Sequence, residues 1–410
     1  MSDAIDKTGN LAQAMEHAKQ LLDHDLQQAA LQLEEILAAV PDYAPAHFLK
    51  AVVLGQQQRG EQAIQALEKV LALDANHPEA WRLLADHSAA IGDKAASESA
   101  YLRHLQSATG NPNLQQAAAA MIANELPTAE RILKSHLKNA PTDVAAIRML
   151  AEVAVRVGRN DDAQALLEYC LELTPGFSGA RYNLAVLLHR TNKSDDALRE
   201  VDQLLAEEPD RPGYRNLAAV VCSRIGEYER SSQLYQALLE EYPQNAKVWL
   251  SYAHVLKTEG KREACEAAYR GAIDRDERFG EAYWSLANLK TFRFSEQDIA
   301  NMHRQVTRED LELSSRVQFH FALGKAAEDT GDYAESFDHY DKGNALHRST
   351  LNYQHAQNNQ RVNRMKTQFT GSFFRQRAGM GCPDDSPIFI VGMPRAGSTL
   401  LEQILASHSQ

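Results

Sequence analysis

The residues most suited to chemistry lie near the end of the sequence, in the stretch GMPRAGST. Gly392 and Gly397 bound a short loop, and Ser398 and Thr399 follow it with two hydroxyl groups. Glycine lets the backbone approach a ligand closely, and successive N–H groups of such a loop can point at one anion. Arg395 adds a positive charge inside the loop. The stretch therefore predicts a binding site for a phosphate-like group.

Two elements would have to hold this loop in place. The apolar run 388–391 precedes it, and its length and β-branched residues predict a buried strand of a parallel sheet. Residues 400–406 follow with the pattern of an amphipathic helix. A helix that begins directly after the loop adds the partial positive charge of its N-terminus. The order strand, loop and helix is typical of an α/β phosphate-binding motif.

The spacing of the loop matches a Walker A motif at every position but one. Ser398 stands where a nucleoside triphosphatase has the lysine that contacts the β- and γ-phosphates. The cation is instead Arg395, which suits one 5′-phosphoryl or phosphosulfate group and disfavours a triphosphate with magnesium. A strand-to-helix turn without any ligand is the alternative interpretation.

A period of 34 residues dominates the chain before this loop. Glycine and asparagine tolerate the left-handed backbone of a turn between helices, and proline ends a helix. A small side chain lets two helices pack closely. Four successive units repeat these features. The predicted helix ends are at Pro141, Pro175, Pro209 and Pro243, and the predicted turns are at Gly158, Asn192, Gly226 and Gly260. The predicted small residues are Ala163, Ala197, Ser231 and Cys265.

This pattern resembles the tetratricopeptide repeat, a helix–turn–helix unit that stacks into a superhelix. The period begins weakly at residues 10–43, loses two residues in 112–143, lapses after 279 and returns at 317–350. The resemblance implies an all-α solenoid of about nine units over residues 1–350. Such arrays bind a protein or peptide in their concave groove.

Composition narrows the classes of function. The 43 Lys+Arg and 55 Asp+Glu give a net charge of −12, which disfavours binding to nucleic acid. No apolar stretch approaches the roughly 18 residues of a membrane span, and the N-terminus lacks a signal-peptide pattern, so we expect a cytoplasmic protein. The four cysteines and the scattered histidines predict no metal site; His320 and His339, for example, lie 19 residues apart.

Residues 351–386 are predicted to form a basic helical linker. Five basic residues and no acidic residue occur between positions 351 and 380, namely Arg361, Arg364, Lys366, Arg375 and Arg377. The segment is either a solvated helix or an electrostatic approach to an anion held by the following loop. Phe369, Phe373 and Phe374 are candidates to dock it onto the next domain.

The stretch PIFIVGMPRAGSTLLEQILASHS resembles the 5′-phosphosulfate-binding loop of sulfotransferases, in particular the tyrosylprotein sulfotransferase-like branch. With the repeats before it, the chain also resembles a bacterial family in which tetratricopeptide repeats precede a sulfotransferase domain. The resemblance implies that 3′-phosphoadenosine 5′-phosphosulfate is the co-substrate. It assigns binding of this donor to Gly392, Arg395, Ala396, Gly397, Ser398 and Thr399.

By the same resemblance, Arg395 has a catalytic role. It would neutralise the charge that develops on the bridging oxygen while the sulfuryl group moves to a hydroxyl acceptor, such as a protein tyrosine. No metal is expected in this reaction. The sequence departs from the family's PRSGTT-type core at Ala396 and Ser398, which replace serine and threonine.

In that family the general base, the residues that hold the 3′-phosphate and the acceptor pocket all lie beyond this loop. Residues 387–410 are therefore expected to be the N-terminal fragment of a sulfotransferase domain, and the 410 residues to be inactive by themselves. The alternative is a tetratricopeptide-repeat scaffold that binds proteins without catalysis.

Overall fold

The structure is a computed structural model that describes residues 7–22, 24–289, 291–351, 354–384, 386–393 and 396–408. Throughout these ranges the regular elements are helices, and no β-strand occurs. The chain divides into two compact units, one up to Leu346 and one from His347 on, and the last helix of the first unit continues past this boundary to Thr350.

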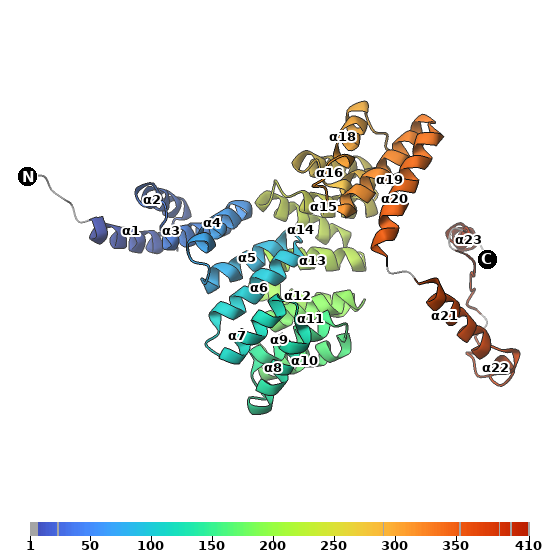
Figure 1. The fold of residues 1–410 in the computed structure, drawn as a ribbon, viewed down its shortest axis with the longest axis horizontal. Coiled ribbons are helices and arrows are strands. Elements are labelled where there is room, and N and C mark those ends of the chain that lie inside the picture. The colour runs from blue at the N-terminus through green and yellow to red at the C-terminus, as the bar shows by residue number, and fades with distance from the viewer. Residues whose placement is uncertain are drawn as a thin grey trace, which may run out of the picture. The chain divides into compact units, whose positions relative to one another are not determined.

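The first unit is a solenoid of helices joined mostly by short turns (Figure 1). Its helices are α1 (Lys7–Leu21), α2 (Leu26–Ala39), α3 (Ala44–Gln56), α4 (Gly60–Leu73), α5 (Pro78–Ala90), α6 (Lys94–Ala108), α7 (Pro112–Ile122), α8 (Leu126–Asn139), α9 (Val144–Arg156), α10 (Asn160–Leu173), α11 (Ser178–Arg190), α12 (Ser194–Glu207), α13 (Pro212–Ile225), α14 (Tyr228–Glu241), α15 (Ala246–Thr258), α16 (Arg262–Arg275), α17 (Gly280–Ala287), α18 (Glu296–Val306), α19 (Leu313–Thr330) and α20 (Tyr333–Thr350).

The turn inside each repeat has the left-handed backbone that the period predicts. The φ angles are 80° at Gly158, 62° at Asn192, 96° at Gly226 and 76° at Gly260. In the unit 112–143, which is two residues shorter than the others, the corresponding turn is at Asn124, with φ 59°. It lies 32 residues after Gly92. Asparagine and glycine adopt this conformation at little steric cost, so the sequence positions of these residues fix the helix boundaries.

The predicted small residues lie in the core of the solenoid. Ala163, Ala197, Ser231 and Cys265 are all fully buried. Each of the four predicted prolines lies two residues after the last residue of a helix: α8, α10, α12 and α14 end at Asn139, Leu173, Glu207 and Glu241. These observations confirm the tetratricopeptide architecture.

The solenoid also folds back on itself, which the repeat pattern does not predict. Helix α5 packs against α13, four repeats further along the chain. The Asn216 side chain donates a hydrogen bond of 2.9 Å to the carbonyl of Ala89, and the Gly213 N–H donates one of 3.2 Å to Asp86 Oδ1. Residues of α5 and α13 therefore line one pocket together.

The period lapses where the sequence predicts. Helix α17 ends at Ala287, and α18 begins only after Ser295, which caps it in a reciprocal hydrogen-bonded pair with Asp298. Helices α19 and α20 then form a longer hairpin, which turns at Gly331 with φ 84°. Among the described residues, no helix is both long and apolar enough to cross a membrane.

The second unit contains α21 (His355–Gln368), α22 (Gly371–Arg375) and α23 (Ser398–Ala406). Helix α21 is exposed along its whole length and carries the first three predicted basic residues. It ends at Gln368, and Gly371 begins the short helix α22. The rings of Phe369 and Phe373 pack against each other with centroids 5.1 Å apart, and those of Phe373 and Phe374 with centroids 5.3 Å apart.

Candidate functional site

The structure describes the predicted anion-binding loop except for its two central residues. These two, Pro394 and Arg395, lie outside the described residues. Gly397 has φ 82°, a left-handed conformation suited to glycine, and it directly precedes the first residue of α23, Ser398. A helix leaves the N–H groups of its first turn without intrahelical acceptors, so the amides after Gly397 are available to an anion. The predicted helix is thus present and begins two residues earlier than expected.

The strand predicted at 388–391 is not formed. This segment has no regular secondary structure, and Ile388, Phe389 and Val391 are 72%, 86% and 92% exposed instead of buried. A strand needs a neighbour to satisfy its backbone groups, and no other described residue of the chain forms one. The apolar side of α23 is likewise uncovered, with Leu400 63% exposed.

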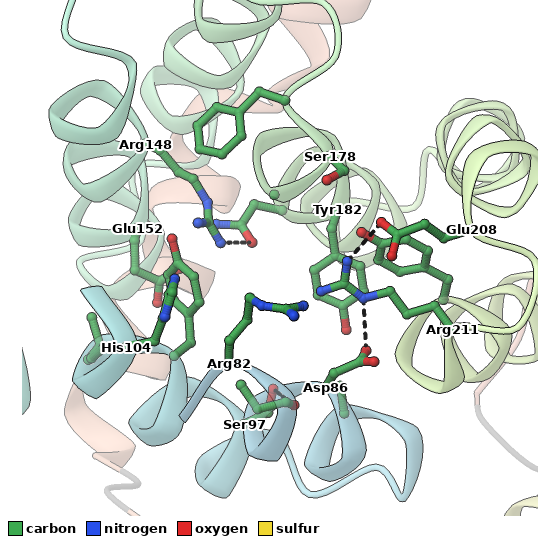
Figure 2. A pocket seen from close by; sticks show the side chains of 18 of the residues that line it. Arg82, Asp86, Ser97, His104, Arg148, Glu152, Ser178, Tyr182, Glu208 and Arg211 are labelled. Carbon is green, nitrogen blue, oxygen red and sulfur yellow. Dashed lines mark hydrogen bonds and ion pairs between the residues drawn. The ribbon is translucent and has the colours of Figure 1, made fainter. Parts of the chain in front are cut away.

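A second candidate site lies on the concave side of the solenoid. It is a pocket of about 380 Å³ between α5, α6, α9, α11 and α13, shown in Figure 2. Polar and aromatic side chains line it. They include Arg82, Asp86, Tyr101, His104, Arg148, Glu152, Arg156, Phe177, Tyr182, Asn183, Glu208, Arg211 and Tyr214.

The three carboxylates of this pocket are each paired with an arginine. Arg211, the residue before α13, lies 3.3 Å from Asp86 and 2.9 Å from Glu208. Arg156 Nε lies 3.0 Å from Glu152. The acidic groups are therefore largely neutralised inside the pocket itself.

Arg148 differs from the other arginines of the pocket. It is only 7% exposed, its guanidinium lies 3.8 Å from the centroid of the Tyr101 ring, and it forms no ion pair with a described residue. Its Nε has no hydrogen-bond partner in the described part of the chain, and Nη2 makes one long hydrogen bond of 3.4 Å to Asn183. Burial lowers the pKa of Arg148 to about 10, so the side chain stays cationic at neutral pH.

Arg82 reaches into the same pocket from α5, opposite Arg148 (Figure 2). Its Nε donates a hydrogen bond of 2.7 Å to Glu79, which is not part of the pocket lining. Tyr182 and Tyr214 form an aromatic wall with ring centroids 5.7 Å apart. The pocket thus offers Arg148 without a carboxylate partner, Arg82 with a partner outside the lining, and flat aromatic surface, although the chain as a whole is acidic.

The sequence analysis did not predict this site because its residues are spread over more than a hundred positions. Three of its residues nevertheless share a position within the repeat. Arg82, Arg148 and Tyr182 each occupy the fifth position of the first helix in their repeats, in α5, α9 and α11. Equivalent positions of stacked repeats face the same side, so a comparison of this position along the array would have brought the three residues together.

The histidines are arranged differently from the prediction. His320 of α19 and His339 of α20 are buried, and their Nδ1 atoms lie 3.0 Å apart. Burial lowers the pKa of His320 to about 4 and also lowers the pKa of His339. The exposed His303 and Glu335 lie beside His339, and these three could hold a metal ion. The 19-residue separation was therefore not a sound reason to dismiss His339 as a ligand.

Comparisons with known protein families find matches in several parts of the chain. Family models described as tetratricopeptide repeat match residues 20–86, 154–221 and 246–279. A model described as sulfotransferase family matches residues 387–410. The chain therefore contains tetratricopeptide repeats, followed by a short stretch with the pattern of a sulfotransferase.

One curated relative is an uncharacterized protein of Aquifex aeolicus (strain VF5), 27% identical over 167 residues. The match covers 41% of this chain and spans 22% of the length of that relative. Among solved structures, a tetratricopeptide repeat protein from Parabacteroides merdae is similar with 16% identity and a TM-score of 0.46, covering 58% of this chain and 93% of that one. The human IFIT1 dimer with PPP-AAAA is similar with 16% identity and a TM-score of 0.43, covering 75% of this chain and 78% of that one.

Proposed function

We propose that the solenoid recruits a protein partner by binding an acidic segment of it in the concave pocket. The observation that carries this proposal is the environment of Arg148. A buried cation without a carboxylate partner attracts an anion far more strongly than an exposed one, because less water screens it. Since the carboxylates of the pocket are already paired, they leave this charge for a ligand.

The shape and lining of the pocket support a peptide as the ligand. A volume of about 380 Å³ accommodates a few side chains of an extended segment. Arg82 and Arg148 provide charged donors for carboxylates, whereas Tyr182 and Tyr214 provide flat surface for an aromatic or aliphatic side chain. An acidic segment that contains a tyrosine would use both features.

The test is fluorescence anisotropy with a labelled peptide of glutamate and tyrosine residues and the full chain. We expect Arg148→Met and Arg82→Met each to weaken binding about tenfold, the worth of one charge-assisted hydrogen bond. Arg224→Met is the matched control, because Arg224 is an exposed arginine of α13 outside the pocket. Equal affinity in the wild type and both pocket variants would refute the proposal.

We further propose that residues 387–408 belong to the donor-binding part of a sulfotransferase. The match of residues 387–410 to the sulfotransferase family and the left-handed Gly397 in front of α23 favour this second function. The donor would be 3′-phosphoadenosine 5′-phosphosulfate, and the sulfuryl group would pass to a hydroxyl acceptor, with a tyrosine of the recruited partner as the candidate. The finer assignment to the tyrosylprotein branch is part of this proposal.

Each residue of the loop has a role in the proposed reaction. The amides of Ser398 and Thr399 and their hydroxyls donate hydrogen bonds to the 5′-phosphosulfate. Gly392, Ala396 and Gly397 keep the backbone close to this group, since none of them has a bulky side chain. Arg395 neutralises the negative charge on the bridging oxygen as the bond to sulfur breaks.

Calorimetry with 3′-phosphoadenosine 5′-phosphate tests this second proposal. We expect saturable binding to the full chain that Arg395→Ala weakens at least tenfold, because the variant removes the cation of the loop. Arg199→Ala, an exposed arginine of α12, should bind as the wild type does. If Arg395→Ala and Arg199→Ala bind equally well, Arg395 does not have the assigned role, and the scaffold without catalysis becomes the better description.

A further inference from the structure

The last three helices of the solenoid bring a set of metal-binding side chains together. His303 comes from α18, and Glu335 and His339 come from consecutive turns of one face of α20. One donor atom of each residue lies within 4.8 Å of the other two. Glu335 Oε1 lies 3.5 Å from His303 Nε2 and 3.8 Å from His339 Nε2.

These separations are too long for hydrogen bonds, which join such atoms at about 2.7–3.2 Å. They are instead close to the spacing of ligands around a small ion. Zinc binds imidazole nitrogen and carboxylate oxygen at about 2.0–2.2 Å, which places tetrahedral ligands about 3.4 Å from one another. His303 and Glu335 are exposed, so these two side chains can adjust to an ion more easily than the buried His339.

A fourth side chain orients one of the ligands. His320 Nδ1 lies 3.0 Å from His339 Nδ1, and both rings are buried. When the proton of His339 is on Nδ1 and is donated to His320, the Nε2 lone pair of His339 points toward Glu335 and His303. Metal-bound histidines commonly donate their second N–H in this way, which fixes the tautomer and the ring orientation.

We propose that His303, Glu335 and His339 form a binding site for a divalent transition-metal ion, with zinc as the best match. Two imidazoles and one carboxylate suit zinc and its neighbours in the first transition row, whereas magnesium and calcium prefer oxygen ligands alone. Three protein ligands leave one coordination position for water or for a group of a partner. The site is in the solenoid and is independent of the sulfuryl transfer proposed above.

The ion would join α18 to α20. Helix α18 belongs to the segment in which the repeat period lapses, and it packs against α19 with Met302 in the core. A bond from α18 through the ion to α20 would fix this irregular segment at the end of the array. Metal binding to the folded state alone raises stability, so the ion should also raise the thermal midpoint.

The experiment is calorimetry of zinc chloride into the tag-free full chain, treated first with a chelator. A Cys382→Ser background removes the exposed thiol as a competing ligand. We expect one equivalent of zinc to bind, at least tenfold weaker binding for Glu335→Gln and for His303→Ala, and unchanged binding for His347→Ala, an exposed histidine two turns further along α20.

A second readout is independent of the heat of binding. Zinc should raise the thermal midpoint of the wild type and of His347→Ala, but not that of Glu335→Gln, while magnesium should have no effect on any of them. Because His303 and Glu335 are exposed, both variants should keep the fold, which far-ultraviolet circular dichroism would confirm. Absence of saturable zinc binding, or equal affinity in all four proteins, would overturn the proposal.

Discussion

The Nδ1 atom of His87 and the hydroxyl oxygen of Tyr242 are hydrogen-bonded at 2.7 Å, although 155 residues separate them in the sequence. Both side chains are buried. The pair joins α5 to the residue that follows α14, and it lies beside the contact between α5 and α13. This fold-back brings Asp86 of α5 and Tyr214 of α13 to the same pocket, so the stability of the contact and the existence of the pocket are linked.

Gly60→Ala should destabilise the fold-back. A Cβ at position 60 would lie 2.3 Å from the ring of Tyr242, which is buried and held by His87, so the ring has no room to move aside. Overpacking of this kind costs about 1–3 kcal/mol, only partly offset by the better helix propensity of alanine. Urea denaturation would measure the loss. Gly55→Ala is the control, because its Cβ would meet His87 at an ordinary 3.8 Å; equal stability of the two variants would contradict the contact.

Arg215→Met should destabilise the protein by about 3–5 kcal/mol, because it leaves a buried carboxylate without its partner. Arg215 Nη2 lies 2.5 Å from Glu241 Oε2, and the Glu241 side chain is 1% exposed. The double variant Arg215→Met/Glu241→Met should recover most of the loss, since it removes the unpaired charge as well. Denaturant midpoints of the two variants would show this; a double variant less stable than the single one would argue against a simple ion pair.

Acid should destabilise the solenoid through its buried histidines. Burial lowers the pKa of His87 below the value of about 6.5 that it has in the unfolded chain. The unfolded state therefore binds more protons than the folded state, and stability falls as the pH drops from about 6.5 toward the folded-state pKa. Thermal midpoints at pH 7 and pH 5 would measure the fall.

His87→Gln isolates the contribution of this residue. It should be less stable than the wild type at pH 7, because the contact with Tyr242 is altered, but its midpoint should fall less between pH 7 and pH 5. A pH dependence as steep as that of the wild type would assign the effect to the other buried histidines, His320 and His339, whose pKa values are also lowered by burial.

The repeat architecture could be predicted because every unit has the same types of residue at its turn, at its helix contact and at its helix end. Gly226 must adopt a positive φ, Ser231 must fit between two backbones, and Pro243 must follow a helix end, all within one 34-residue unit. Local constraints of this kind are visible in the sequence. The helix after Gly397 was predictable for the same reason.

The pocket and the metal-binding cluster were not predictable in this way. Arg82 and Arg211 line the same pocket only because the solenoid folds back, and nothing in the 34-residue period specifies the packing of α5 against α13. His303 and His339 come from α18 and α20 and lie near each other only in the folded chain. The strand at 388–391, in contrast, was predicted but is not formed. Its residues are suitable for a strand, but a strand needs a neighbouring strand, and no described residue forms one.

The central claim is that an acidic segment binds inside the concave pocket, and photo-crosslinking tests it most directly. A benzophenone amino acid would replace Tyr182, which lines the pocket, or Tyr169, which is 41% exposed on α10 and does not. We expect the glutamate–tyrosine peptide to form an adduct with the protein modified at position 182, and Arg148→Met to reduce its yield. Adducts at position 169 alone, or equal adducts at both positions, would contradict the claim.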